Sequence, residues 1–344
     1  MSSTRGLDLA RVLVLGGAGF IGYHLTRHLA ENTQDQITIV DNLSRGQLDG
    51  DLEDLLRRHP SVNLVVGDLA NSQAYDNLSG SFDQVYLLAG IVGVSNVEQA
   101  PYRVLRTNTG IILNAFDWLA RVGCGRLMFA STSEVYAGTV DLGIAQVPTD
   151  ETVPVAVLDT QQPRSTYAMT KMLGEAFVTH LAQTSGFEAV IVRFHNVYGP
   201  RMGLSHVVPE LMQRIHKRLD PLPVYGLDQA RAFCYITDAV KACVALMECD
   251  LDGSHIVNVG NEDEEVKIRD LVDTLLNVTG FHPEITNLPA AEGSTDRRCP
   301  DIARLRTLTG FENEVDLRLG LRLTWEWYRR RFELEATDGS GLIH

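Results

Sequence analysis

The chain has 344 residues, of which 44% are hydrophobic and 22% are charged, so fibres and disulfide-stapled miniature folds are excluded. Its net charge of -14 disfavours a nucleic-acid binder, because such binding needs clustered positive charge, but it is compatible with a small anionic ligand. Five scattered cysteines without a C-x-x-C pair predict reduced thiols. With no signal-peptide pattern and no apolar run long enough to span a bilayer, we expect a cytoplasmic protein without membrane contacts.

Short β-branched and leucine-rich runs alternate with helical patterns through the first part of the chain. This alternation predicts an α/β fold, a Rossmann-type doubly wound parallel sheet with helices on both faces. The predicted strands are residues 11–15, 36–40, 63–66, 84–89, 126–130 and 189–194, and the first helix is 23–31.

Prolines interrupt the pattern after residue 195, and helices are predicted at 206–219, 237–248 and 268–279. We therefore expect an NAD-binding domain over residues 1–195 and a smaller α/β lobe, mainly for the substrate, over 196–334. Residues 335–344 are polar and glycine-rich and are predicted to be a flexible tail.

Three glycines, Gly16, Gly19 and Gly22, lie between the first strand and the first helix. Because glycine has no side chain, the backbone can approach a pyrophosphate, and the N-terminus of the helix also favours such an anion. The alternative is a tight turn that binds no ligand. Asp41 follows about 20 residues later and would bind both ribose hydroxyls, which favours NAD over NADP. Because Arg45 lies four residues further along the chain, NADP remains an alternative cofactor.

A helical segment at residues 165–177 carries Tyr167 and Lys171. The spacing of four places both side chains on one face of a helix. A nearby ammonium favours the phenolate, so Tyr167 is the candidate base for a substrate hydroxyl, with an amphipathic surface pair as the alternative.

The strand at residues 126–130 leads into Thr132, Ser133 and Glu134. Side chains at the carboxyl end of a parallel strand point into the crevice where such sheets bind ligands. A hydroxyl of Thr132 or Ser133 could contact the reacting group opposite Tyr167. Glu134 is a candidate for a second proton transfer beside the reacting carbon. Alternatively, it is a carboxylate at the end of a strand that points into solvent. Asp68, at the end of the third strand, is placed to touch the adenine.

These motifs together resemble the extended short-chain dehydrogenase/reductase family that acts on nucleotide sugars. The resemblance covers about residues 10–330, and its motifs are residues 16–22, Asp41-Asn42, 67–69, Asn108, 131–136, Tyr167 with Lys171, and 193–201. It implies a homodimer formed by helices 108–121 and 167–184. It also implies NAD contacts from Gly16, Gly19, Phe20, Ile21, Gly22, Asp41, Asn42, Ser44, Asp68, Leu69, Leu88, Ala89, Gly90, Asn108, Tyr167 and Lys171.

Within the family, the triplet Thr132-Ser133-Glu134 is similar to that of UDP-glucuronate decarboxylases and of GDP-mannose 4,6-dehydratases, whereas simple 4-epimerases usually lack the acid. Residues 224–238, 257–261 and 297–302 also resemble the decarboxylases. The resemblance implies that Asn196 and Arg231 hold the diphosphate and nucleotide and that Arg298 enters the active site. Residues 296–298 also resemble the dehydratases, in which arginines here bind the diphosphate, so Arg298 is a candidate for either role. His195, where an aromatic residue is usual, and the loop at 91–101 depart from the pattern.

The leading hypothesis is NAD-dependent decarboxylation of UDP-glucuronate through a 4-keto intermediate, giving UDP-xylose, the UDP-4-keto-pentose, or both. The expected catalytic set is Thr132, Ser133, Glu134, Tyr167, Lys171 and Arg298. A nucleotide-hexose 4,6-dehydratase, a 4-epimerase and a non-catalytic NAD-binding sensor or scaffold are the alternatives. No metal site is expected, because His24 and His28 have no third ligand in sequence.

Overall fold

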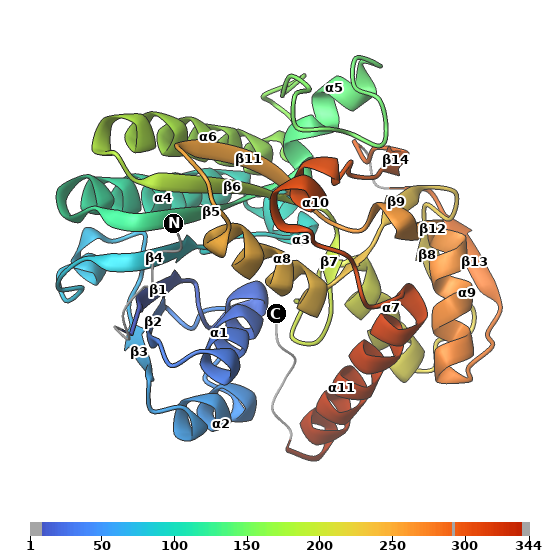
Figure 1. Cartoon of the computed structure of the whole chain (residues 1–344). Coiled ribbons are helices and arrows are strands. Elements are labelled where there is room, and N and C mark those ends of the chain that lie inside the picture. The colour runs from blue at the N-terminus through green and yellow to red at the C-terminus, as the bar shows by residue number, and fades with distance from the viewer. Residues whose placement is uncertain (1–8, 291–292, 339–344) are drawn as a thin grey trace.

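The computed structural model describes residues 9–290 and 293–338. Its centre is a seven-stranded sheet in the order β11-β6-β5-β4-β1-β2-β3, with every pair of neighbours parallel (Figure 1). The strand order reverses between β1 and β4, which is where doubly wound sheets bind ligands. The predicted Rossmann-type fold is therefore confirmed.

All six predicted strands belong to this sheet, and their ends differ from the prediction by at most two residues. The seventh, β11, was not predicted, because its first half, Ser254 and His255, is polar. The strands are β1 Arg11–Leu15, β2 Gln36–Asp41, β3 Val62–Val66, β4 Phe82–Leu87, β5 Cys124–Thr132, β6 Glu188–Phe194 and β11 Ser254–Val259. β11 comes from the segment assigned to the smaller lobe, so the two parts of the chain interleave.

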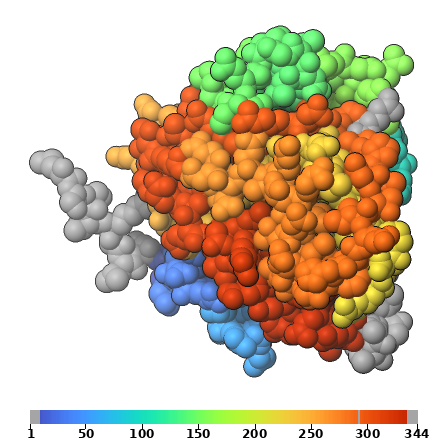
Figure 2. All heavy atoms as spheres, turned by 90° about the vertical axis from the view of Figure 1, so that its right-hand side faces the viewer, coloured from blue at the N-terminus to red at the C-terminus, as the bar shows by residue number. Residues whose placement is uncertain are grey.

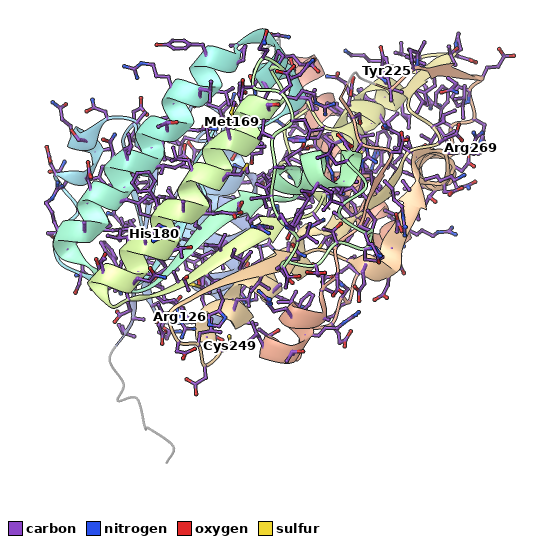
Figure 3. The ribbon with its side chains drawn as sticks, turned by 90° about the horizontal axis from the view of Figure 1, so that it is seen from above. Arg126, Met169, His180, Tyr225, Cys249 and Arg269 are labelled. Carbon is purple, nitrogen blue, oxygen red and sulfur yellow. The ribbon has the colours of Figure 1, made fainter. Side chains whose placement is uncertain are left out.

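Helices cover both faces of the sheet, and alternate strand residues face opposite ways. Leu13 and Phe129 pack beneath α4 and α6, whereas Val14 and Met128 pack beneath α1 and α8. In Figure 3, α4 and α6 lie side by side, with Met169 and His180 marking α6. The helices are α1 Phe20–Asn32, α2 Gly50–Arg58, α3 Val94–Gln99, α4 Pro101–Val122, α5 Ala137–Asp141, α6 Ser165–Ser185, α7 Val207–His216, α8 Ile236–Glu248, α9 Ile268–Thr279, α10 Ala303–Thr309 and α11 Leu317–Asp338, with 3-10 turns η1 Ser72–Tyr75, η2 Ser133–Tyr136 and η3 Glu262–Glu264.

The smaller lobe is built on short sheets at the carboxyl end of the central one. Figure 2 shows this side of the molecule, covered mostly by orange and red segments with the green segment around α5 along its upper edge. Its strands pair as β12-β9-β14, β10-β7 and β13-β8. These strands are β7 Val197–Tyr198, β8 Leu222–Tyr225, β9 Ala230–Ala232, β10 Cys234–Tyr235, β12 Glu265–Lys267, β13 Ile285–Leu288 and β14 Arg297–Arg298.

The predicted flexible tail at 335–344 requires a correction at its start. Helix α11 continues to Asp338, so residues 335–338 are helical. The helix is anchored by buried Leu321 and Tyr328, and Glu335 and Ala336 are good helix formers that extend it. The other predicted tail residues, 339–344, lie outside the described residues. Among the described residues, no helix is both long and apolar enough to cross a membrane.

Candidate active site

The turn between β1 and α1 is shaped by glycines that pack against backbone. A Cβ on Gly22 would lie 2.1 Å from the Gly16 carbonyl oxygen, and one on Gly16, whose φ is +94°, would lie 2.7 Å from the Ala89 nitrogen. Helix α1 begins at Phe20 behind Gly19, and no side chain caps its first N–H groups. This turn therefore fits a pyrophosphate, which takes hydrogen bonds from such groups and is favoured by the helix dipole.

Asp41 ends β2 next to this turn and is buried. Its carboxylate accepts hydrogen bonds from the Ala18 nitrogen at 3.1 Å and the Leu43 nitrogen at 2.8 Å. Burial raises the pKa of Asp41, and these backbone donors oppose that rise. The carboxylate is thus placed at the glycine turn, and its contact with a ribose stays a prediction.

The segment after β4 runs between the glycine turn and Lys171. Asn108 holds it, accepting from the Ile91 nitrogen at 2.7 Å and donating to the Ile91 oxygen at 3.0 Å, so its role is to position this loop. A Cβ on Gly90 would lie 3.8 Å from Lys171 Nζ. The remaining predicted cofactor residues lie at the same edge of the sheet or at the start of α1: Phe20, Ile21, Asn42, Ser44, Asp68, Leu69, Leu88 and Ala89.

Tyr167 and Lys171 lie on α6 beside the end of β5. The Lys171 ammonium is buried, 5.7 Å from the centre of the Tyr167 ring, and donates to the Ala130 oxygen at 2.7 Å. The nearby Thr132 hydroxyl favours the ionised form of Tyr167. Burial and the Glu134 carboxylate raise the pKa of Tyr167, while burial lowers that of Lys171 to about 8. Tyr167 therefore needs further positive charge before it can act as a base.

Glu134 and Arg298 form an ion pair, with Arg298 Nη1 donating to Glu134 Oε1 at 2.7 Å. Burial disfavours the ionised Glu134, but Arg298, with Arg164 and Arg231, outweighs burial and lowers the pKa of its carboxyl. Glu134 also influences the titration of Tyr167, so the two groups share one site. The Glu134 carboxylate thus lies among three guanidinium groups, and the carboxylates of Asp141 and Asp296 also contribute to the charge at this end of the crevice.

The two residues predicted to hold the diphosphate lie close together but already have protein partners. Arg231 is paired in register with Arg298 across β9 and β14, and it donates to the Thr295 oxygen at 2.6 Å and the Asp296 oxygen at 3.2 Å. Burial, followed by Arg298, lowers the pKa of Arg231 to about 10. Asn196, with φ +39°, donates to the Ala232 oxygen at 3.0 Å. Both residues order the strands that carry Arg298.

A buried salt bridge beneath the site was missed by sequence reasoning. Arg193 donates to both carboxylate oxygens of Glu175, at 2.9 and 2.6 Å, and to the Tyr136 hydroxyl at 2.8 Å. Ser131 also donates to Glu175. Burial disfavours the charged form of Arg193, but Glu175 outweighs it and raises its pKa. Glu175 follows Lys171 by four residues, and that spacing on one helix face was the available signal.

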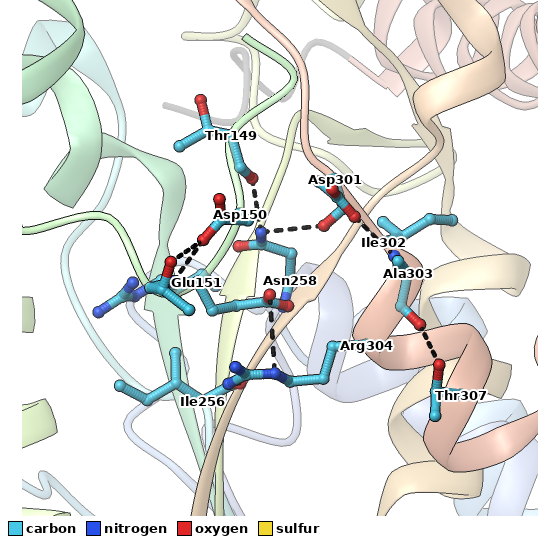
Figure 4. A network of polar contacts seen from close by, with 12 residues as sticks. Thr149, Asp150, Glu151, Ile256, Asn258, Asp301, Ile302, Ala303, Arg304 and Thr307 are labelled. Carbon is cyan, nitrogen blue, oxygen red and sulfur yellow. Dashed lines mark hydrogen bonds and ion pairs between the residues drawn. The ribbon is translucent and has the colours of Figure 1, made fainter. Parts of the chain in front are cut away.

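Asn258, on β11, joins this pair to the segment that carries Arg298. Its Nδ2 donates to the Thr149 oxygen at 2.9 Å and the Asp301 oxygen at 3.1 Å, and its backbone nitrogen donates to Glu151 at 2.8 Å (Figure 4). Its Oδ1 accepts from the Tyr136 hydroxyl at 3.0 Å. Because these groups come from distant parts of the chain, no local pattern in the sequence could predict this network.

A family model described as "NAD dependent epimerase/dehydratase family" matches residues 12–260. The chain belongs to this family. The predictions of family, of an enzyme and of an NAD cofactor are thereby confirmed. The glycine turn described above provides the independent structural fit to that cofactor.

Its relatives include a "UDP-glucuronic acid decarboxylase 1" from Xenopus tropicalis, 33% identical over 96% of this chain and 75% of that protein. A "UDP-N-acetyl-alpha-D-glucosaminuronate decarboxylase" from Bacillus cytotoxicus is 32% identical over 93% of this chain and 98% of that protein. A solved "UDP-galactose 4-epimerase" superposes with a TM-score of 0.79 at 28% identity, covering 93% of this chain and 99% of that one.

Proposed function

We propose that the enzyme decarboxylates UDP-glucuronate through a 4-keto intermediate, giving UDP-xylose, the UDP-4-keto-pentose, or both. The observation that carries this proposal is the pairing of Glu134 with Arg298 beside Tyr167, with Arg164 and Arg231 close enough to act on the same carboxylate. A guanidinium group that makes forked hydrogen bonds suits a substrate that brings a uronate and a diphosphate. The two relatives described above are named as decarboxylases of two different UDP-linked uronates, which supports decarboxylation as the reaction.

The first step needs a base at the C4 hydroxyl of the sugar. NAD, when bound, accepts a hydride from the substrate and can return it. Tyr167 takes the hydroxyl proton, Thr132 hydrogen-bonds the reacting oxygen, and the Lys171 ammonium favours the phenolate. The product of this step is a β-keto acid, because the uronate carboxylate is two carbons from the new ketone.

The second step breaks the bond between C5 and the carboxylate. The electron pair of that bond moves toward the C4 ketone and gives an enolate, while CO2 leaves. Arg298 binds the charge of the carboxylate or delivers the proton that replaces it, and Glu134 with Ser133 orients the sugar. Ser133 is buried at the start of η2, directly after β5, and this position supports the proposed role.

A panel of nucleotide sugars tests the proposal. Purified enzyme with NAD is incubated separately with UDP-glucuronate, UDP-glucose and GDP-mannose, and the masses of the products are measured by mass spectrometry. The proposal expects UDP-glucuronate to lose the mass of one CO2 and the neutral sugars to be unchanged. Loss of water from a neutral sugar would identify a dehydratase, and a change of stereochemistry without a change of mass an epimerase.

The enzyme is further proposed to be a homodimer built on α4 and α6. These neighbouring helices expose Leu113 and Leu173, 41% and 39% accessible, together with Tyr102 (Figure 3). An apolar face of this kind on two adjacent long helices suits a second copy of the same chain. Light scattering should give the mass of a dimer for the wild type and a monomer for Leu113→Glu/Leu173→Glu. The control, Leu323→Glu on α11, should stay dimeric, and a monomeric wild type would refute the dimer. A cytoplasmic location stays a prediction.

A further inference from the structure

Arg45 lies in the loop after β2, and this loop is pressed onto the glycine turn. A Cβ on Gly46 would lie 2.1 Å from the Ala18 oxygen, so the backbone of the loop contacts the turn directly. Arg45 lines a hollow together with Ala18, Gly19 and Phe20. Its side chain is therefore beside the first N–H groups of α1.

The other side of Arg45 rests on the segment before α7. Its Nη2 lies 3.3 Å from His206 Nε2, and a Cβ on Gly203 would lie 2.5 Å from Nη2 and 3.2 Å from Cζ. Burial lowers the pKa of His206 to about 4, so the imidazole is neutral and its Nε2 accepts from the guanidinium. Gly203 and His206 contact the guanidinium group and thereby fix the direction of the Arg45 side chain.

Arg45 has no acidic partner among the described residues. The charges that act on it are those of Tyr167 and Tyr328, whereas neighbouring Arg201 is paired with Asp49 at 2.6 Å. A partly desolvated guanidinium without a carboxylate is stabilised by any anion that enters the same space. Its place between the glycine turn and Tyr167 indicates which anion that is.

We propose that Arg45, held by Gly203 and His206, binds the pyrophosphate of NAD from the side opposite the N-terminus of α1. Asp41, predicted to bind the adenosine ribose, lies at the glycine turn, whereas the charge of Arg45 acts on Tyr167, which is predicted to face the nicotinamide half of the cofactor. Arg45 is therefore not a reader of an NADP 2′-phosphate. Its positive charge also lowers the pKa of Tyr167 and helps to form the phenolate.

The test measures cofactor affinity by calorimetry without any sugar, so its outcome does not depend on the proposed decarboxylation. NAD, NADP and ADP-ribose are titrated into wild type, Arg45→Gln and Arg45→Lys. Because Arg45→Gln loses a charge-assisted hydrogen bond, its affinity for NAD and for ADP-ribose should fall about tenfold or more. Arg45→Lys should lose less affinity. Neither variant should change the preference for NAD over NADP. The control Arg269→Gln removes an exposed arginine paired with Asp228 and should bind all three as the wild type does.

Unchanged affinity of Arg45→Gln for NAD would overturn the proposal, as would a loss confined to NADP. Thermal melting establishes that each variant is folded. Substitutions of His206 provide a second measurement, because His206→Gln keeps a hydrogen-bond acceptor for Arg45 whereas His206→Leu removes it. The proposal predicts weaker NAD binding for His206→Leu than for His206→Gln. Equal binding by the two variants would show that His206 does not position Arg45.

Discussion

Arg298 and Glu134, 164 residues apart in the chain, form a hydrogen-bonded ion pair of 2.7 Å at the mouth of the catalytic crevice. The pair joins the turn after β5, in the dinucleotide half, to β14 in the smaller lobe. It favours the ionised form of Glu134 close to Tyr167. In the proposed reaction, the loss of the carboxylate takes place at this pair.

The coupling between these two residues is measured by a double-mutant cycle. Glu134→Gln and Arg298→Gln should each lower kcat on UDP-glucuronate by about a hundredfold, because each removes a charge from the reacting region. The double variant should lose less than the product of the two, with a coupling of about 1 kcal/mol or more. NAD affinity serves as the control and should not change. Strictly multiplicative losses would mean that the ion pair has no catalytic role.

The base is tested by removing one hydroxyl. Tyr167→Phe should lower turnover by about 10²- to 10⁴-fold, since the phenolate is lost while the ring remains. NAD binding should stay within a factor of about two, because Tyr167 is one of many expected NAD contacts and the variant loses only its hydroxyl. Stopped-flow turnover and calorimetry make the comparison. Retained turnover would assign the base to another group.

The salt bridge beneath the site predicts a stability effect. Glu175→Gln leaves the Arg193 guanidinium, 3% exposed, without its charge partner. Such a loss should reduce the free energy of unfolding by about 3–5 kcal/mol, measured in urea. The exposed pair of Arg269 with Asp228 provides the matched control, and Asp228→Asn should leave the free energy of unfolding unchanged within the error of the measurement. Equal effects of the two substitutions would disprove the structural role of Glu175.

His195 predicts how stability depends on pH. Burial, with Arg298 and Arg193 nearby, lowers its pKa from 6.5 to about 3, despite a contact between Nε2 and Asn258 Oδ1 at 3.2 Å. Between pH 6.5 and 3 the unfolded chain binds a proton that the folded chain does not, so the free energy of unfolding falls as pH falls through this window. His195→Phe should remove the part of this fall that comes from one histidine and shift acid unfolding, followed by circular dichroism, to lower pH. His24 and His206, whose pKa values are also lowered by burial, continue to contribute. An unchanged midpoint would show that His195 is not the responsible group.

The fold and the chemically distinctive residues were accessible from the sequence because their signals are local. Strand β1 and helix α9 have the predicted bounds, since β1 is one apolar run and α9 repeats apolar residues every three or four positions. The glycine turn, Asp41, Tyr167 and Lys171 were likewise predicted by short spacings. These features need only a strand, a turn and a helix to bring their residues together.

What the sequence did not reveal depends on contacts between distant segments. Strand β11 returns to the central sheet after an excursion through the smaller lobe, and Asn258 on it binds groups from residues 149–151 and 301. The contact of Arg45 with His206 spans 161 residues. No periodicity encodes such pairings, because they are set by how the two halves pack.

The central claim is that this crevice removes the carboxylate of a UDP-hexuronate after oxidation by the Tyr167 site. The most direct measurement is release of labelled CO2 from carboxyl-labelled UDP-glucuronate by the enzyme with NAD, compared with Tyr167→Phe. We predict stoichiometric release by the wild type and release by the variant reduced at least a hundredfold. No labelled CO2 from the wild type, or equal release by both proteins, would contradict this account.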